Sequence, residues 1–481
     1  MVLSGTEVAK NNTKDSCWVV IHGQVWNVTD FLDEHPGGAK LIFNCAGRDA
    51  TEAYDSIHNP DLIAETLSPD CCLGPIDDAS SLPRTAESPS STSPAPANRK
   101  PAFPRLGAVL NADDFEKVAH AYLSETGWAY YSSGAEDELS LGDARRIFRK
   151  LALRPRVLRA VDSVSTSTSL LGLPSSLPLY ISPTGQAKYA HPEAETVLAR
   201  AAGREGILYC VPTRPSASLE SIFASRAAPG QPLCFQLYVD RDRQKAQRTI
   251  RRAEKLGAAA IFVTVDSPVI GKRERDERLT VSYDDDDDDD SSPLPSEPVG
   301  VAKSTASGLL NAGLTWADLA WIRATTALPL VVKGVQSVED ALLAHEHGAR
   351  AIVLSNHGGR SMDTAQAPVL TLLEIRRYAP RLLAPETRPG FQVFVDGGIR
   401  RGTDVIKALA LGASAVGVGR PFLYAMTAGY GEAGVRRLVQ ILRREVQTNM
   451  ALAGAASVGD IVPEMVNSER AEREVTRRVK L

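Results

Sequence analysis

The sequence lacks several features that would assign it to a specialised class of protein. No apolar run approaches the 18 or more residues of a membrane-spanning helix, and none opens the chain as a signal peptide. Only six of the 481 residues are cysteines, and their spacing fits neither a disulfide framework nor a CxxC metal site. The 54 Lys and Arg residues are outnumbered by 58 Asp and Glu residues, so no basic excess is available for nucleic-acid binding. These absences predict a soluble, multi-domain protein of a reducing compartment, without a membrane span or a nucleic-acid partner.

Two segments of biased composition divide the chain. Residues 77–101 (DDASSLPRTAESPSSTSPAPANRKP) are rich in Ser, Pro and Ala and contain no aromatic residue, so we predict a flexible linker. Seven consecutive aspartates, Asp284–Asp290, lie within a second segment at 283–300. We predict that this segment is an exposed acidic insertion, because like charges repel one another and stay hydrated. The linker separates an N-terminal module at 1–76 from a larger domain at 102–481.

Eight short apolar runs alternate with helical patterns in the larger domain. They are Leu177–Ser182, Gly206–Val211, Leu233–Val239, Ala260–Val265, Leu330–Val335, Ala351–Leu354, Gln392–Val395 and Ala415–Val418. Continuous rather than alternating hydrophobicity indicates strands that are buried on both faces, as in a parallel sheet covered by helices. Eight such strand–helix units predict the α/β class and a (β/α)8, or TIM, barrel. The acidic insertion falls between the fourth and fifth strands, on the face where active sites of such barrels lie.

Polar side chains end these strands abruptly. The strand ends read SPTG, QLY, TVDSP, KGV, SNHGGR, VDGGIRRG and GVGRPF in chain order. Lys, His, Arg and Asp are rare in a protein core, and catalytic residues of these barrels cluster at the carboxyl ends of the strands. We therefore predict one active site at this end of the barrel.

The last two strand ends are typical of phosphate binding. Gly397–Arg400 and Gly417–Arg420 each combine glycine backbone N–H groups with an arginine, after strands seven and eight. Phosphate sites of such barrels form at this place, and an arginine can bind phosphate through two hydrogen bonds.

The remaining strand ends carry candidates for acid–base chemistry on an anionic substrate. Arg273 and Arg360 can each grip a carboxylate with two hydrogen bonds. His357 is a candidate base, and Asp266 could orient it and stabilise its charge. Lys333 could stabilise negative charge that develops on a cofactor, and the alternative is an ordinary exposed loop lysine.

The N-terminal module carries a second signal in His35 and His58. Two histidines alone are more often surface or core residues than ligands. Their surroundings, CWVVIHGQVWNVTDFLDEHPGG and AGRDATEAYDSIH, resemble the cytochrome b5-like haem-binding domain across nearly all of residues 1–76. The resemblance implies a small α+β domain in which His35 and His58 are the axial ligands of haem b. Iron held by two imidazoles has no open position, so such a haem transfers single electrons.

The larger domain also resembles a known family. The segments WAYYSSGAEDE, FQLYVDRDR, FVTVDSPVIGKRE, VVKGV, VLSNHGGR and FVDGGIRRGTDVIKALALGA resemble the FMN-dependent L-2-hydroxy acid dehydrogenases and oxidases, from Phe103 to about Ser457. With the haem-binding module in front, the chain is similar to the flavocytochrome b2 family, the cytochrome-type L-lactate dehydrogenases.

This resemblance implies a role for each matching residue. It implies His357 and Asp266 as the catalytic base and its partner, and Tyr238 as the residue that binds the substrate hydroxyl. It implies a substrate carboxylate held by Tyr130, Arg273 and Arg360. The residues implied to bind FMN are Thr184, Gln236, Thr264, Lys333, Ser355, Asp396, Gly398, Arg400, Gly419 and Arg420.

Three positions depart from the lactate pattern of this family. Gly185 stands where Ala is usual, which predicts a wider space beside flavin and substrate. Pro212 replaces a serine that commonly contacts the flavin. Arg214 replaces a bulky apolar residue, and it is either turned to solvent or aimed at a second anionic group of the substrate. The 2-hydroxy acid class is therefore expected, and lactate itself is open.

The predicted function is oxidation of an L-2-hydroxy acid, lactate or a related acid, to the 2-oxo acid. Electrons would pass from FMN to haem b and then to a cytochrome c-like acceptor. One alternative is an oxidase that forms hydrogen peroxide and has an auxiliary haem domain. Another is an electron carrier fused to a barrel that has lost catalysis, against which the complete set of site residues argues.

Assembly and compartment are expectations from weaker signals. The family resemblance implies a homotetramer. The haem-binding module begins close to Met1 without an Arg-rich leader, and the terminal Val479-Lys480-Leu481 only approximates the peroxisomal Ser-Lys-Leu signal. We expect a cytoplasmic protein, with the mitochondrial intermembrane space and the peroxisome as alternatives.

Overall fold

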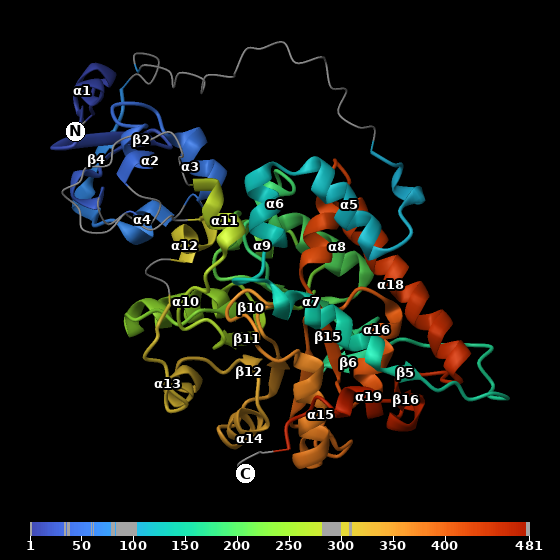
Figure 1. Cartoon of the computed structure of the whole chain (residues 1–481). Coiled ribbons are helices and arrows are strands. Elements are labelled where there is room, and N and C mark those ends of the chain that lie inside the picture. Colours follow the sequence, from blue (N-terminus) through green and yellow to red (C-terminus); the bar gives the residue numbers. More distant parts are fainter. Residues whose placement is uncertain are drawn as a thin grey trace. The chain divides into compact units, whose positions relative to one another are not determined.

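The computed structural model forms two compact units (Figure 1). It describes residues 2–32, 35, 39–58, 60, 62–77, 82, 103–280, 300–306 and 310–477. The first unit comprises residues 1–102, 216–218 and 276–307, and the second comprises 103–215, 219–275 and 308–481. Nearly all of the predicted linker at 77–101 and of the predicted acidic insertion at 283–300 lies outside the described residues.

The first unit contains a four-stranded antiparallel sheet and short helices. The strands pair in the order β1 (Asn12–Thr13), β2 (Ser16–Ile21), β3 (Gln24–Asn27) and β4 (Cys72–Pro75). The helices are α1 (Gly5–Lys10), α2 (Ala39–Phe43), α3 (Thr51–Ile57) and α4 (Leu62–Thr66). Successive side chains of β2 point to opposite faces of the sheet, so that Cys17, Val19 and Ile21 enter one apolar cluster and Val20 enters another.

The second unit is a closed barrel of eight parallel strands, as predicted. Its strands are β8 (Leu179–Ile181), β9 (Leu208–Val211), β10 (Leu233–Leu237), β11 (Ala258–Thr264), β12 (Leu330–Val335), β13 (Ala351–Leu354), β14 (Gln392–Val395) and β15 (Ala415–Val418). Each strand pairs with its neighbour in the chain, and β15 pairs with β8 to close the barrel. Nearly every strand residue is buried, which explains why the hydrophobic runs are continuous.

Helices surround the barrel (Figure 1). They are α5 (Ala112–Tyr122), α6 (Glu125–Ser132), α7 (Leu139–Arg146), α8 (Glu195–Glu205), α9 (Leu219–Ala224), α10 (Arg243–Lys255), α13 (Asp318–Thr325), α14 (Val338–Glu346), α15 (Pro368–Tyr378), α16 (Gly402–Ala410), α17 (Arg420–Met426), α18 (Gly431–Ala453) and α19 (Glu469–Glu472). Two short helices, α11 (Glu274–Glu277) and α12 (Val301–Ala306), lie between β11 and β12 in the chain. Side-chain caps fix helix starts, as where Ser337 accepts a hydrogen bond from the Asp340 N–H at the start of α14. In the part of the chain that the structure describes, no helix has both the length and the apolar character of a membrane span.

The interior of the barrel is a packed core. Tyr180, Phe262 and Phe394 form its aromatic centre, with ring centroids 5.7–6.0 Å from Tyr180. A hairpin of β6 (Thr168–Leu170) and β7 (Leu173–Ser175) packs Leu170, Leu171 and Leu173 against these interior residues at the amino end of the barrel. A second small sheet pairs β5 (Ala152–Leu153) with β16 (Val466–Asn467). Because the interior and the amino end of the barrel are filled with apolar side chains, polar side chains can gather at the carboxyl ends of the strands.

Candidate functional site

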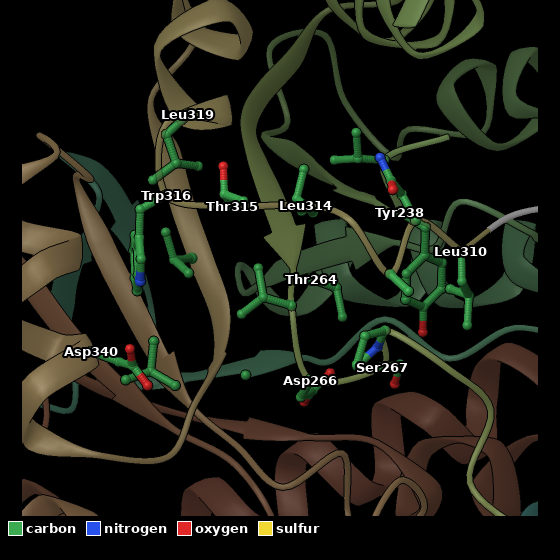
Figure 2. A pocket seen from close by; sticks show the side chains of 18 of the residues that line it. Tyr238, Thr264, Asp266, Ser267, Leu310, Leu314, Thr315, Trp316, Leu319 and Asp340 are labelled. Carbon is green, nitrogen blue, oxygen red and sulfur yellow. The ribbon is translucent and has the colours of Figure 1, made fainter. Parts of the chain in front are cut away.

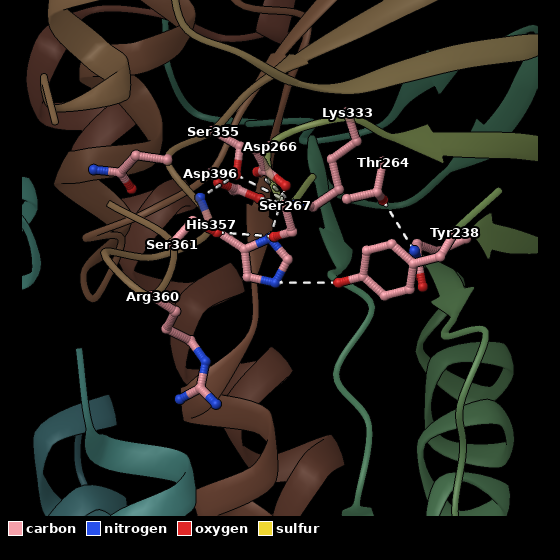
Figure 3. Close-up of polar contacts among 12 residues, drawn as sticks. Tyr238, Thr264, Asp266, Ser267, Lys333, Ser355, His357, Arg360, Ser361 and Asp396 are labelled. Carbon is pink, nitrogen blue, oxygen red and sulfur yellow. Dashed lines mark hydrogen bonds and ion pairs between the residues drawn. The ribbon is translucent and has the colours of Figure 1, made fainter. Parts of the chain in front are cut away.

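Three predicted catalytic residues meet at the carboxyl end of the barrel (Figure 3). His357 follows β13, Asp266 follows β11 and Tyr238 follows β10. The Nδ1 atom of His357 lies 2.8 Å from Oδ1 of Asp266, and its Nε2 atom lies 3.4 Å from the Tyr238 hydroxyl oxygen. One ring nitrogen is therefore held by a carboxylate, and the other faces a hydroxyl donor.

The backbone around His357 is a tight turn that presents the imidazole. His357 has a φ of +56°, and Gly358 and Gly359 follow with φ of +65° and +74°. A Cβ atom at Gly359 would lie 2.6 Å from the backbone nitrogen of Leu141, so that only glycine allows this approach. The HGG sequence is thus required by the turn as well as by the chemistry.

Lys333 connects the pair of His357 and Asp266 to the ends of two further strands, β13 and β14. Its Nζ atom lies 3.4 Å from Oδ2 of Asp266, 3.3 Å from the Ser355 hydroxyl and 3.9 Å from Oδ2 of Asp396. All four side chains are buried. One carboxylate oxygen of Asp266 therefore accepts a hydrogen bond from His357, and the other accepts one from Lys333. These contacts compensate the buried negative charge of Asp266.

The charges of this cluster set its protonation. Burial raises the pKa of Asp266, but Lys333 and His357 outweigh burial and bring it down to about 2. Burial lowers the pKa of Lys333, but Asp266 and Asp396 raise it above its ordinary value. Burial lowers the pKa of His357 against the opposing effect of Asp266, and burial together with Asp266 raises the pKa of Tyr238 to about 12. At neutral pH the cluster holds a carboxylate, an ammonium, a neutral imidazole and a phenol.

The predicted carboxylate-binding residues lie together. The Arg360 guanidinium lies 5.0 Å from the centre of the Tyr130 ring and donates a hydrogen bond of 2.6 Å to the Tyr130 carbonyl oxygen. Nε of Arg273 donates to the Arg360 carbonyl oxygen at 3.2 Å. Two guanidinium groups and a phenol ring from three segments thus converge.

The two arginines of the predicted phosphate site, Arg400 and Arg420, are half-buried at the carboxyl end of the barrel. Arg420 donates to the carbonyl oxygens of Tyr131, Ser133 and Gly358 at 2.8–3.0 Å, and burial together with Arg360 lowers its pKa to about 9. Burial lowers the pKa of Arg400, which lies 3.8 Å from Asp113 and 3.9 Å from Glu116. An anion beside these guanidinium groups would offset the cost of burying them.

The glycines of this site permit close backbone contacts. A Cβ atom at Gly398 would lie 1.9 Å from the Ala144 carbonyl oxygen. A Cβ atom at Gly419 would lie 3.3 Å from Cγ2 of Thr184. Bare backbone therefore lines this part of the site, as phosphate binding requires.

The donors and acceptors present fit a phosphorylated flavin. Gln236 donates to the Thr264 hydroxyl at 3.0 Å, which fixes two polar side chains on β10 and β11. Among the described residues, the Thr184 hydroxyl, Oδ1 of Asp396 and Nε of Arg400 are buried without a hydrogen-bond partner. Buried polar atoms are nearly always paired, so this site calls for a polar ligand.

The two predicted haem ligands face each other in the first unit. The ring centroids of His35 and His58 are 6.2 Å apart, at an interplanar angle of 80°. When two imidazoles bind one metal, the distance between their ring centres is the sum of two metal–nitrogen bonds of about 2.0–2.1 Å and the two distances from nitrogen to ring centre. This sum is roughly 6 Å. The spacing fits one iron between the rings. No group of three or more His, Cys, Asp or Glu side chains suited to a metal occurs in the described residues, and a haem needs none.

The space predicted beside Gly185 is occupied by backbone. A Cβ atom at Gly185 would lie 2.7 Å from the carbonyl oxygen of Arg214, closer than real Cβ contacts allow. The backbone after β9 occupies the space that an alanine methyl group would take at this position. The glycine is thus matched to its neighbouring loop and does not simply widen the pocket.

We expect Gly185→Ala to destabilise the holoenzyme by about 1–3 kcal/mol, because the added methyl overpacks against a backbone atom. Urea unfolding followed by fluorescence measures the change. Gly107→Ala is the matched control, since a Cβ atom at Gly107 meets nothing within 4 Å. Equal stabilities of the two variants would contradict the clash.

A cavity of about 320 Å³ lies next to the catalytic residues (Figure 2). Its lining includes Tyr238, Asp266 and Ser267, together with residues 310–312, residues 314–316 and Leu319. His357, Lys333 and Arg360 do not line it. The cavity borders the reaction centre and offers room beyond it.

Two site residues were not found by reasoning from the sequence. Ser267 and Ser361 each follow a predicted site residue, and their hydroxyls lie 2.8 Å apart beside His357. They are separated by 94 residues, so no spacing pattern could connect them. Their adjacency to Asp266 and Arg360 is the only sequence signal that could have drawn attention to them.

Comparison with known proteins decides the family. Residues 119–468 match the model of FMN-dependent dehydrogenases, and residues 4–77 match that of the cytochrome b5-like haem/steroid-binding domain. The chain belongs to the FMN-dependent dehydrogenase family. With its haem domain in front, it has the flavocytochrome b2 organisation and is an oxidoreductase of that type.

Similar proteins cover nearly the whole chain. It is 40% identical to an L-lactate dehydrogenase (cytochrome) of Wickerhamomyces anomalus over 461 residues, 96% of this chain and 79% of that protein. A protein of the same name from Saccharomyces cerevisiae is 38% identical over 473 residues, 97% of this chain and 79% of that protein. The recombinant flavin-binding domain of baker's yeast flavocytochrome b2 superposes with a TM-score of 0.70 at 37% identity, covering 79% of this chain and 91% of that structure.

Proposed function

We propose that this flavocytochrome oxidises a small L-2-hydroxy acid, L-lactate or a close relative, to the 2-oxo acid and passes the electrons through haem to a c-type cytochrome. The observation that carries this proposal is the neutral His357, held by Asp266 and facing Tyr238, beside the paired arginines Arg273 and Arg360. A base next to two arginines that can bind a carboxylate suits a substrate whose hydroxyl and carboxylate are on neighbouring carbons. The names of the two relatives support lactate.

Each side chain then has a definite task. Arg360, Arg273 and Tyr130 bind the substrate carboxylate and orient the molecule. The substrate hydroxyl binds between Tyr238 and His357, and Nε2 of His357 takes the proton that the oxidation releases. The Asp266 carboxylate stabilises the resulting imidazolium and keeps the Nδ1–H tautomer in place.

The polar residues at the carboxyl end of the barrel fit FMN, which would accept two electrons when it is bound. Arg400 and Arg420, with the backbone at Gly398 and Gly419, would hold its phosphate. Lys333 would stabilise negative charge at its ring, and the polar side chains left for its remaining atoms are Thr184, Gln236, Thr264, Ser355 and Asp396.

The charge of the haem domain supports a cationic electron acceptor. Residues 4–77 contain twelve Asp and Glu residues and four Lys and Arg residues, a net charge of −8. A negative field of this size steers positively charged partners to the domain and speeds association at low salt. We therefore propose a basic c-type cytochrome as the acceptor. A homotetramer and a cytoplasmic location stay predictions from the sequence.

Anaerobic stopped-flow mixing with L-lactate tests the proposed function. The flavin absorbance should bleach first, and the haem bands should then become reduced. Added cytochrome c should be reduced in turn. Flavin that bleaches while the haem stays oxidised, with hydrogen peroxide formed in air, would favour the oxidase. Failure of lactate with success of another 2-hydroxy acid would change only the substrate.

We expect the acid limb of kcat/KM to have its midpoint below the ordinary histidine pKa of about 6.5. Burial and Lys333 lower the pKa of His357, and only the neutral imidazole can accept a proton, so activity falls as pH falls through that value. Asp266→Asn should move the limb to still lower pH, because the Asp266 charge raises the pKa of His357. The pH dependence of kcat/KM measures both, and a midpoint above pH 7 would contradict this reading.

A further inference from the structure

Two serines extend the catalytic pair into a longer network (Figure 3). The Ser267 hydroxyl oxygen lies 3.2 Å from Nδ1 of His357, the same atom that lies 2.8 Å from Asp266. The Ser361 hydroxyl oxygen lies 2.8 Å from that of Ser267. Nδ1 of His357 thus has two oxygen neighbours, one charged and one neutral.

The charge of Asp266 determines which ring nitrogen of His357 carries a hydrogen in this network. Asp266 is ionised and can only accept, so Nδ1 of His357 carries the hydrogen and donates it. Ser267 then offers a lone pair to the same N–H, as the second acceptor of a three-centre hydrogen bond. Its own hydrogen must point elsewhere, and the Ser361 oxygen is at hydrogen-bond distance.

The backbone holds the two serines together. A Cβ atom at Gly271 would lie 2.1 Å from the carbonyl oxygen of Ser361, so the loop after β11 presses on the loop after β13. The Ser267 side chain is buried and that of Ser361 is partly exposed. The hydrogen bond between them therefore joins the loop that carries Asp266 to the loop that carries His357 and Arg360.

We propose that Ser267 is a positioning residue for the base, which accepts the Nδ1–H of His357 beside Asp266, and that Ser361 fixes the direction of its hydroxyl. The lone pair of Ser267 stabilises the imidazolium that forms when His357 takes a proton. It acts in the same direction as Asp266, against the burial and the Lys333 charge that oppose this protonation. The inference rests on the proposed function, since it assumes that His357 is the base.

The test compares pH profiles of the holoenzyme and its variants with L-lactate. Ser267→Ala should move the acid limb of kcat/KM down by about 0.5–1 pH unit and lower kcat about three- to tenfold, with KM changed less than about twofold. Ser361→Ala should cause a smaller shift in the same direction, and Ser361→Thr, which keeps the hydroxyl, should restore the original profile. The double variant should equal Ser267→Ala, because Ser361 acts only through Ser267.

Controls separate this role from folding and from the proposed function. Met362→Ala changes an exposed neighbour of Ser361 and should leave the profile unchanged. Flavin and haem spectra and the melting temperature report on the folding of each variant. Profiles of Ser267→Ala and the unmodified enzyme that superpose would overturn the proposal, as would equal losses in Ser361→Ala and Ser361→Thr. Absence of flavin bleaching in the unmodified enzyme with every 2-hydroxy acid would instead overturn the proposed function.

Discussion

Replacing His357 by Gln should lower kcat/KM by about 10²- to 10⁴-fold, the usual contribution of a general base. Nε2 of His357 faces the Tyr238 hydroxyl, where the substrate hydroxyl is proposed to bind, and glutamine has no basic nitrogen to offer there. The amide oxygen of glutamine cannot take the proton either. Anaerobic flavin bleaching by L-lactate measures the loss directly, without a contribution from the haem.

Two observations keep this prediction specific to the base. The absorbance of bound flavin and the content of haem should be unchanged, because the imidazole contacts Asp266, Ser267 and Tyr238, and these three are not among the residues proposed to hold FMN or haem. Added imidazole should restore part of the activity of His357→Gln, because a free base then takes the place of the missing one. Undiminished turnover in this variant would instead show that His357 is not the base of the reaction.

The barrel could be predicted from the sequence because strands that are buried on both faces have continuous hydrophobic sequences. Each of the eight strands overlaps a predicted run, and β12, β13, β14 and β15 have the predicted bounds. Hydrophobicity alone locates them, as in Ala351–Leu354, where every residue is buried. The predicted site residues were visible for the converse reason. Lys333 interrupts a hydrophobic run, and Asp266 directly follows one. Charged residues at such buried positions are rare unless they have a partner or a function.

Contacts between distant loops could not be predicted in the same way. The hydrogen bond from Ser267 to Ser361 and the approach of the Arg214 carbonyl to Gly185 depend on the path of the backbone after the strand ends. The three carbonyl oxygens that hold Arg420 belong to α6 and the residues after it and to the turn after His357. Side-chain identity fixes which groups are available, and only the folded backbone decides which of them meet.

The charges of the site explain why so many ionisable groups are buried together. Arg360, Arg273, Arg400 and Arg420 place positive charge around the positions proposed for the substrate carboxylate and the phosphate. Burial lowers the pKa of Arg420 to about 9, because desolvation disfavours the charged guanidinium. Anionic ligands beside these guanidinium groups would offset that cost.

Replacing His58 by Ala should abolish the reduction of cytochrome c and leave the chemistry of the flavin intact. His58 and His35 face each other at a distance that fits two ligands on one iron, so loss of either ring would remove a proposed axial ligand. The sharp Soret band of the six-coordinate haem should disappear. Anaerobic bleaching of the flavin by L-lactate should keep its rate, because the side chains that hold the His357 imidazole, those of Asp266, Ser267 and Tyr238, all belong to the barrel.

His22→Ala is the matched control for this variant in the same domain. The His22 imidazole pairs with Asp55 at 2.8 Å, and its ring lies 6.0 Å from that of Tyr54. Its loss should leave the haem spectrum and the reduction of cytochrome c nearly unchanged. If His58→Ala still reduced cytochrome c at the original rate, electrons would leave the flavin directly and the haem would be auxiliary. A parallel loss in both histidine variants would point to unfolding of the domain rather than to the axial bond, and the haem content of each preparation separates these outcomes.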